Sequence, residues 1–200
     1  MNQVEPGVDQ LRKWWTSSFN DDTVAFGLIH KNLYPGLFSY ASKLLGDGEL
    51  ADDAVQDLFV KIWNKRVGIG QLQNVKAYFF TALRRQVLNQ LRDLKLRQLK
   101  ISMIAQPDLE FSQEEVLVRK EEDQQVVQKV VELLNNLPTR QKEVVYLFFF
   151  ESMSISQISE VLEINYQSVM NLKQRALLKM RAISVISIFV FCLFLLAGSI

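Results

Sequence analysis

The feature that most constrains the fold is the stretch from Val75 to Lys100, which contains no glycine or proline and is rich in helix-favouring residues. This composition predicts one long helix. At about 100° per residue, Phe79, Leu83 and Val87 fall on one half of its surface. The opposite half carries a group of basic residues, Arg84, Arg85, Arg92 and Lys95. The sequence therefore predicts a helix with an apolar inner face and a cationic outer face.

Charge is sorted by segment along the chain, although the net charge of the 200 residues is only +1. Five acids and no base lie between Asp47 and Asp57, whereas ten Lys or Arg and one acid lie between Lys61 and Lys100. Such sorting indicates different partners for different segments. A basic face on a rigid helix is typical of proteins that bind phosphate backbones, although exposed helices also carry Lys and Arg without that role.

Cysteine and histidine are too scarce for several kinds of site. Cys192 is the only cysteine and His30 the only histidine, so an internal disulfide and a Cys/His metal site are excluded. The sequence has no Gly-rich phosphate loop, no nucleophile elbow and no evident set of acid, base and nucleophile. We therefore expect neither an enzyme nor a bound cofactor or metal.

Helical periodicity predicts an all-α fold with two small helical domains. A break at Pro107 and the acid-rich residues after it mark a linker between the domains. The predicted segments are an N-terminal extension (1–23), a first helical domain (24–100), a flexible linker (101–125), a second helical domain (126–181) and a C-terminal apolar helix (182–200).

The first domain contains a second strong helical pattern between Glu49 and Trp63, with an apolar inner stripe. Four polar residues near its N-terminal half lie largely off that stripe: Asp52, Asp53, Gln56 and Asp57. Acids at this end complement the helix dipole, and they also form a candidate docking face for a basic partner. Residues 64–74 contain two glycines together with Lys65 and Arg66, and they predict a basic loop beside the cationic helix.

The second domain carries a helix-turn-helix pattern. Ser154 can cap a short helix from Ile155 to Leu162, and Asn165 can cap a second helix that starts at Tyr166. The candidates for base or phosphate contact lie on the outer side of the second helix: Tyr166, Gln167, Asn171, Lys173, Gln174 and Arg175. Helical hairpins with polar faces are common, so this pattern alone does not establish DNA binding.

The C-terminal tail, residues 182–200, contains no charged residue. As a helix it would span about 28 Å, close to the thickness of a bilayer core. Lys179 and Arg181 precede it, and the positive-inside rule then predicts that both domains lie in the cytoplasm, attached to the inner membrane. A second interpretation stays open, in which the tail packs on the second domain or on a partner protein.

The order of these elements resembles that of the extracytoplasmic-function (ECF) sigma factors of bacterial RNA polymerase, within the sigma-70 family. ADDAVQDLFVKIW, at residues 51–63, resembles the signature of region 2, and KAYFFTALRRQVLNQLR, at residues 76–92, is similar to the helix that follows it. Residues 137–181 are similar to region 4. The resemblance covers residues 24–181. Its motifs are specific to the family in combination, whereas each motif alone is weak evidence.

The resemblance implies a protein that binds core RNA polymerase and reads promoter DNA at two elements. The clamp helices of the largest catalytic subunit would contact Asp52, Asp53, Gln56 and Asp57. The loop from Lys65 to Asn74 would hold an unpaired base. The path of the minus-10 element would be lined by Lys65, Arg66, Arg84, Arg85, Arg92 and Lys95.

For the second domain, the resemblance implies that residues 165–175 enter the major groove of the minus-35 element. Lys173 and Arg175 would lie mainly on phosphate. The family also implies an anti-sigma factor as a further partner.

Three positions depart from the usual family residues. Arg85 stands where the family has Asn, Ser159 where it has Ala, and Glu163 where the turn has Gly. A positive φ at Glu163 would cost about 1 kcal/mol relative to glycine. Two alternatives stay open: a one-component helix-turn-helix regulator tethered to the membrane, which would bind duplex DNA without polymerase, and a small membrane-tethered helical adaptor.

Overall fold

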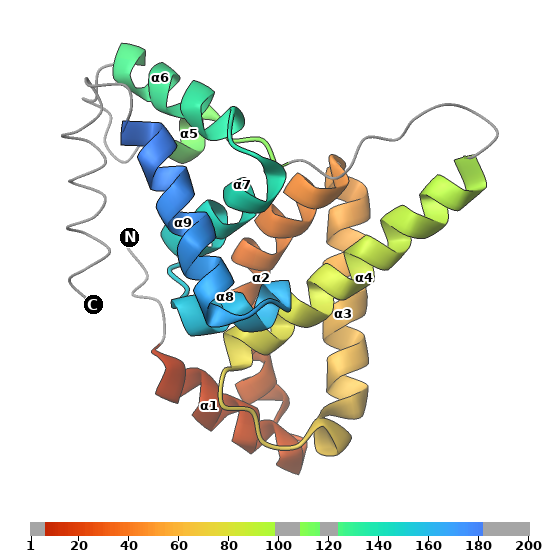
Figure 1. Ribbon diagram of the computed structural model, residues 1–200. Coiled ribbons are helices and arrows are strands. Elements are labelled where there is room, and N and C mark those ends of the chain that lie inside the picture. The colour runs from red at the N-terminus through yellow and green to blue at the C-terminus, as the bar shows by residue number, and fades with distance from the viewer. Residues whose placement is uncertain (1–6, 99–108, 117–123, 182–200) are drawn as a thin grey trace. The chain divides into compact units, whose positions relative to one another are not determined.

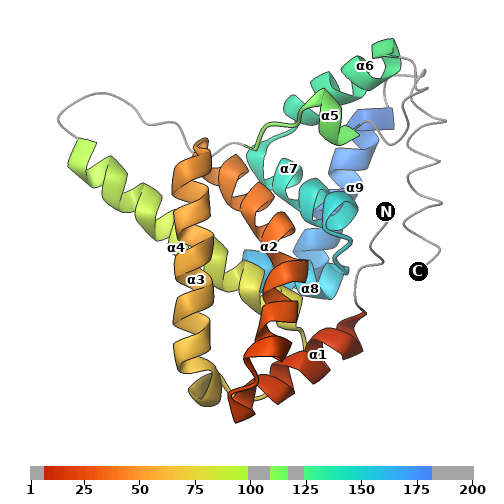
Figure 2. The same ribbon diagram turned by 180° about the vertical axis from the view of Figure 1, so that it is seen from behind.

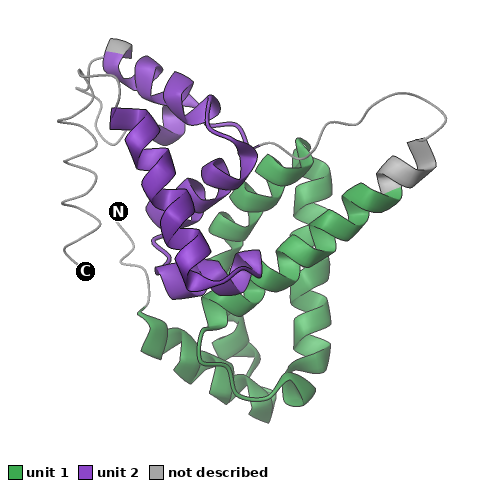
Figure 3. Ribbon diagram, in the orientation of Figure 1, with its two compact units in different colours: residues 1–107 green, residues 108–200 purple. Residues whose placement is uncertain are grey.

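The computed structural model describes residues 7–98, 109–116 and 124–181, and within them it leaves out the side chains of residues 94–98 and 125. The described residues form helices and short connections without a strand (Figure 1), which confirms the all-α fold. The chain divides into two compact units, residues 1–107 and 108–200 (Figure 3).

Two long helices of unit 1 begin at side-chain caps. Asp22 Oδ1 accepts a hydrogen bond from the Ala25 amide at 2.9 Å, and Asp47 Oδ1 accepts one from the Glu49 amide at 2.9 Å. Pro35 lies inside a single continuous helix. The elements are α1 (Val8–Ser17), the 3-10 helix η1 (Ser18–Asn20), α2 (Thr23–Leu45), α3 (Gly48–Ile69) and α4 (Val75–Gln98).

The core of unit 1 joins all four α-helices, and α2 contacts each of the other three (Figures 1 and 2). The fully buried ring of Phe79 in α4 lies 6.3 Å from Trp15 of α1, 6.5 Å from Phe26 of α2 and 5.2 Å from Phe59 of α3. Aromatic rings at these centroid distances pack favourably. The N-terminal residues 8–20 are therefore part of this core and not a separate extension.

Unit 2 is built from shorter helices. Residues 139–150 are continuously helical, and the last five of them form a π-helical turn, η2 (Tyr146–Phe150). The other elements are α5 (Gln113–Val116), α6 (Gln124–Asn135), α7 (Thr139–Val145), α8 (Ile155–Leu162) and α9 (Tyr166–Arg181). Contacts of α9 with α6, α7 and α8 hold the unit together.

Part of the predicted linker is packed into unit 2. Leu109, Phe111 and Val116 are buried, and α5 packs on α6. The side chain of Asn135 in α6 pairs with the backbone of Phe111, accepting from its amide at 2.8 Å and donating to its carbonyl at 3.0 Å. Residues 109–116 therefore pack within unit 2, although the sequence places them in the linker 101–125. The four-residue helix α5 is too short to show a periodicity in the sequence.

The predicted C-terminal apolar helix, residues 182–200, lies outside the described residues. Among the helices that are described, none has the length and apolar character needed to cross a membrane.

Candidate nucleic-acid and protein interfaces

The polar residues on α3 divide into one that is tied to α2 and three that face outward. Asp52 accepts hydrogen bonds from the Tyr34 hydroxyl of α2 and, at 2.9 Å, from Gln56 Nε2. These bonds, chiefly the one from Tyr34, hold the pKa of Asp52 below its usual value, and the same bond raises the pKa of Tyr34. Asp53, Gln56 and Asp57 are exposed, so they form the outward face of α3.

A groove of about 580 Å³ lies between α3 and α4, next to this face. Lys61 Nζ lies 3.4 Å from Asp57 Oδ2 and donates to Gln86 Oε1 at 3.1 Å, which links the two helices. No group of His, Cys, Asp and Glu in the described ranges could hold a metal ion. The groove has three carboxylates and one ammonium group, and its lining residues are Asp53, Ala54, Asp57, Lys61, Gln86, Asn89, Gln90 and Asp93.

The basic loop expected after Trp63 is largely helical, because α3 continues to Ile69. Lys65 is exposed on the last turns of α3. The non-helical connector between α3 and α4 is limited to residues 70–74. Its first residue, Gly70, has φ 74° and ψ −162°, a conformation that other residues rarely adopt.

Arg66 is largely buried and held by contacts within unit 1, which differs from the exposed position expected for a residue that faces nucleic acid. Its side chain is only 11% exposed. The guanidinium donates to the Ser18 carbonyl at 2.8 Å and to the Trp63 carbonyl at 2.6 Å, and it forms an ion pair with Asp21. It also lies 3.8 Å from the centre of the Trp63 ring. All three nitrogens of the guanidinium are therefore engaged within unit 1.

The inner face of α4 is as predicted, because Phe79, Leu83 and Val87 are buried. Arg84 differs from the prediction, since it is only 9% exposed and lies one turn after the buried Phe80. The reason is that α1, α2 and α3 all pack on α4, so burial extends beyond its apolar residues to Arg84. The cationic outer face is correspondingly narrower.

The described members of that outer face are Arg85 and Arg92, which are both exposed. Arg92 Nη1 donates to Asn89 Oδ1 at 3.1 Å. Burial raises the pKa of Tyr78, and the nearby charge of Arg85 opposes this shift, which places that charge close to the phenol. The side chain of Lys95 lies outside the described residues.

The helix-turn-helix of unit 2 is set by local hydrogen bonds. Ser154 Oγ accepts from the Gln157 amide at 3.2 Å, and Gln157 Oε1 accepts from the Ser154 amide at 2.8 Å, which forms a capping box. Asn165 Oδ1 accepts from the Ser168 amide at 2.7 Å and starts α9. Glu163 has φ 55°, so this turn does place a non-glycine residue in the left-handed region.

The outward side of α9 carries most of the predicted contact residues. Tyr166 is 56% exposed, and Gln167, Asn171, Gln174 and Arg175 are exposed as well. Lys173 differs, because its Nζ lies 4.0 Å from the centre of the Phe148 ring and burial lowers its pKa. Lys173 is thus partly packed against η2, and the other five residues form the polar face of α9.

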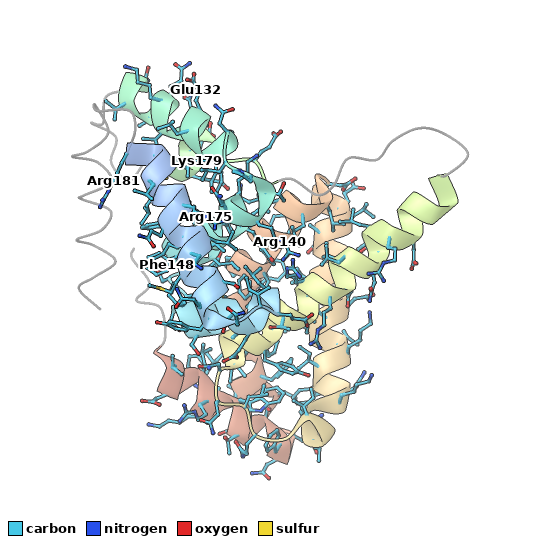
Figure 4. The ribbon with its side chains drawn as sticks, viewed as in Figure 1. Glu132, Arg140, Phe148, Arg175, Lys179 and Arg181 are labelled. Atoms are coloured by element: carbon cyan, nitrogen blue, oxygen red, sulfur yellow. The ribbon has the colours of Figure 1, made fainter. Side chains whose placement is uncertain are left out.

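Unit 2 has further exposed basic side chains that the sequence did not predict as part of the interface. Figure 4 shows Lys179 and Arg181 on α9 beyond Arg175, and Arg140 on α7. All four residues are exposed. The four-residue spacing of Arg175 and Lys179 places them on one side of α9 and could have identified Lys179 from the sequence.

These features define a helical protein of two units, one with an acidic face and a cationic helix and one with a helix-turn-helix. Residues 29–97 match the family described as Sigma-70 region 2, and residues 128–180 match Sigma-70, region 4. The chain belongs to the sigma-70 family, in its extracytoplasmic-function group. It is a sigma factor that binds core RNA polymerase and directs promoter recognition and transcription initiation.

Comparisons with individual proteins are consistent with this family. RNA polymerase sigma factor SigV of Bacillus subtilis (strain 168) is 29% identical over 153 residues, which cover 76% of this chain and 84% of that protein. The fold is similar to that of RpoE in complex with the anti-sigma factor NepR from Bartonella quintana, with a TM-score of 0.58 at 20% identity and coverage of 81% and 98%. CnrH in complex with the cytosolic domain of CnrY gives 0.57 at 18% identity, with coverage of 89% and 99%.

Proposed function

We propose that the exposed residues Asp53, Gln56 and Asp57 of α3 dock on the clamp helices of the largest catalytic subunit of polymerase. The observation that carries this proposal is the division of α3, whose apolar half is buried while these residues face outward beside an acidic groove. Complementary charge at an interface favours both encounter and correct orientation. Asp52 supports the face by accepting a hydrogen bond from Gln56.

The affinity of the full chain for core polymerase tests this docking face. Asp53→Lys places a cation on the face, and we expect it to weaken binding by about tenfold or more. Glu132→Lys makes the same charge change on α6 of unit 2 and is the matched control. If both variants bind core polymerase as the unchanged chain does, the docking face is wrongly assigned.

For the minus-10 element, we propose that Lys65, Arg85 and Arg92 hold the opened strand while the connector (70–74) holds an unpaired base. Opening a duplex costs the stacking of its bases, and a cationic surface beside a binding loop stabilises the resulting single strand. Replacing both Arg85 and Arg92 by Ala should reduce promoter opening more than polymerase binding. Reactivity of unpaired thymines with permanganate measures the opening, and equal loss of both properties would contradict the assignment.

For the minus-35 element, we propose that α9 enters the major groove with its polar face. Amide side chains such as Gln167, Asn171 and Gln174 can pair with base edges, whereas Arg175 suits a phosphate. Gln174→Ala should alter the preferred minus-35 sequence, and Arg175→Ala should weaken all sequences alike. Selection from a promoter library randomised at the minus-35 element distinguishes these two outcomes.

We also propose an anti-sigma factor as a partner, supported by the two structural relatives, which were each solved in complex with a protein partner. A protein that co-purifies with the chain and blocks its run-off transcription would support this. A co-purifying protein without effect on transcription would not.

Membrane attachment through residues 182–200 stays a prediction. Deletion of these residues should move the chain from the membrane fraction to the soluble fraction. A full-length chain found only in the soluble fraction would remove the anchor and leave the tail as a surface for a protein.

A further inference from the structure

We propose that the N-terminal helix α1 fixes the shape of the connector (70–74), and that Trp15 is a positioning residue for selection of the minus-10 sequence. This inference rests on the proposed role of the connector in holding an unpaired base. It assigns a function in promoter reading to a segment that precedes the residues matched by Sigma-70 region 2, which begin at 29.

Three side chains on one side of α1 reach the connector. Trp15 Nε1 donates to the Gly70 carbonyl at 2.9 Å, and Arg12 Nη2 donates to the Gln73 carbonyl at 3.3 Å. The hydroxyl of Thr16 lies 3.1 Å from the side-chain amide oxygen of Gln71. Arg12, Trp15 and Thr16 follow the three- and four-residue spacing of one helix face, so a single rigid element contacts three of the five connector residues.

The position of the Trp15 N–H donor is fixed by the packing of its indole ring. The indole is fully buried, with its ring 5.6 Å from Phe19 and 6.3 Å from Phe79. Indole has a single N–H and no acceptor, and a buried donor without a partner is costly. The position of the Gly70 carbonyl is therefore coupled to the aromatic core of unit 1.

The connector needs such support, because it is short and begins in an unusual backbone conformation. Gly70 has φ 74°, and its amide donates to the Arg66 carbonyl at 3.2 Å. The Arg66 side chain is itself held by the Ser18 carbonyl and by Asp21. Residues 12–21 thus hold the connector along its length and hold the last turns of α3 that lead into it.

This support leaves two amide side chains exposed on a fixed backbone, those of Gln71 and Gln73. Asn and Gln amides pair with the edges of bases, and a preorganised loop loses less entropy when it binds. Trp15 lies beneath the connector and acts on the base through Gly70. Its loss should therefore affect which base is chosen more than whether DNA is bound.

The test is transcription by reconstituted core polymerase with the full chain on a promoter library randomised at the minus-10 element, with sequencing of the transcripts. Trp15→Phe keeps the buried ring and removes the N–H. We expect its preference for the best minus-10 base over the others to fall by about fivefold, the value of one hydrogen bond. Selection at a randomised minus-35 element and affinity for core polymerase should not change, and a purely structural role would lower these together.

Trp14→Phe is the matched control, since Trp14 is the neighbouring residue and makes none of the three connector contacts. Thr16→Val, on the exposed side of α1, is the second variant if Trp15→Phe does not fold, and it should shift minus-10 selection in the same direction. Unchanged minus-10 selection in the folded variants would overturn the inference alone. A full-length wild-type chain that supports no promoter-specific transcription would overturn the proposed function with it.

Discussion

The helix-turn-helix of unit 2 and the connector of unit 1 are positioned by contacts of different range along the sequence. Ser154 pairs with Gln157, and Asn165 pairs with Ser168, three residues away in each case. The connector is held by Trp15 and Arg12, which are 55 and 61 residues away from the groups they bind. The first surface is therefore specified by its own segment, whereas the second depends on the folding of all of unit 1.

This difference predicts that core substitutions in unit 1 act on the minus-10 surface at long range, whereas those in unit 2 act locally.

All three tryptophans, Trp14, Trp15 and Trp63, lie in unit 1, so tryptophan fluorescence follows the unfolding of that unit.

The largest expected effect is that of Phe79→Ala. The ring is fully buried and contacts α1, α2 and α3, so its loss should lower the free energy of unfolding of unit 1 by about 3–5 kcal/mol. Denaturant unfolding followed by tryptophan fluorescence measures this. Leu147→Ala, at a fully buried position of unit 2, is the control and should leave that transition in place. A small effect of Phe79→Ala would contradict the shared core.

The second-largest expected effect is a difference in stability between substitutions of two neighbouring basic residues on α3. Arg66→Gln removes hydrogen bonds to Ser18 and Trp63 and the ion pair with Asp21, and it should cost about 2–3 kcal/mol of stability. Lys65→Gln, on an exposed residue, should change stability by less than about 0.5 kcal/mol. Tryptophan-detected unfolding compares them directly. Equal stability of the two variants would show that the Arg66 contacts are not formed in solution.

The third effect concerns the local motifs of unit 2. Ser154→Ala should lower stability by about 1 kcal/mol through loss of the capping box, and Glu163→Gly should raise it by about 1 kcal/mol because of the positive φ. Thermal unfolding followed by circular dichroism measures both, while the tryptophan signal should be unaffected. A shift of the tryptophan transition in either variant would break the contrast between the units.

The smallest effect is the pH dependence of the Tyr34–Asp52 hydrogen bond. The pKa of Asp52 is lowered from 3.8, so its contribution to stability is present above that value and is lost as the pH falls through the folded-state pKa. The pKa of Tyr34 is raised from 10.0, so its contribution is lost only as the pH rises through a value above that. Between these limits, Tyr34→Phe should therefore be uniformly less stable than the wild type. A difference that persists in strong acid would contradict this role of Asp52.

The sequence predicted those features whose determinants lie within one segment. The all-α fold and the caps at Ser154 and Asn165 follow from residues a few positions apart. The roles of Arg66 and Arg84 could not be predicted in this way. In the sequence, each looks like an ordinary basic residue on an exposed helix. The contacts that bury Arg66 come in part from Ser18 and Asp21, which lie more than 40 residues away in the chain.

The packing of the N-terminal segment could not be predicted, for the same physical reason. Leu11 and Trp15 lie four residues apart on one face of α1, but a ten-residue pattern does not show which helices cover that face. In the structure the indole of Trp15 enters a core formed by three later helices. Conversely, the extent of α3 exceeded its apolar pattern, because the last turns are held by the Arg66 contacts and not by a stripe of buried residues.

The most direct test of the account is the minus-10 selection of the Trp15→Phe chain in the presence of core polymerase. We expect weakened selection at the minus-10 element together with unchanged selection at the minus-35 element and unchanged polymerase affinity. Minus-10 selection equal to that of Trp14→Phe and of the wild type would contradict it.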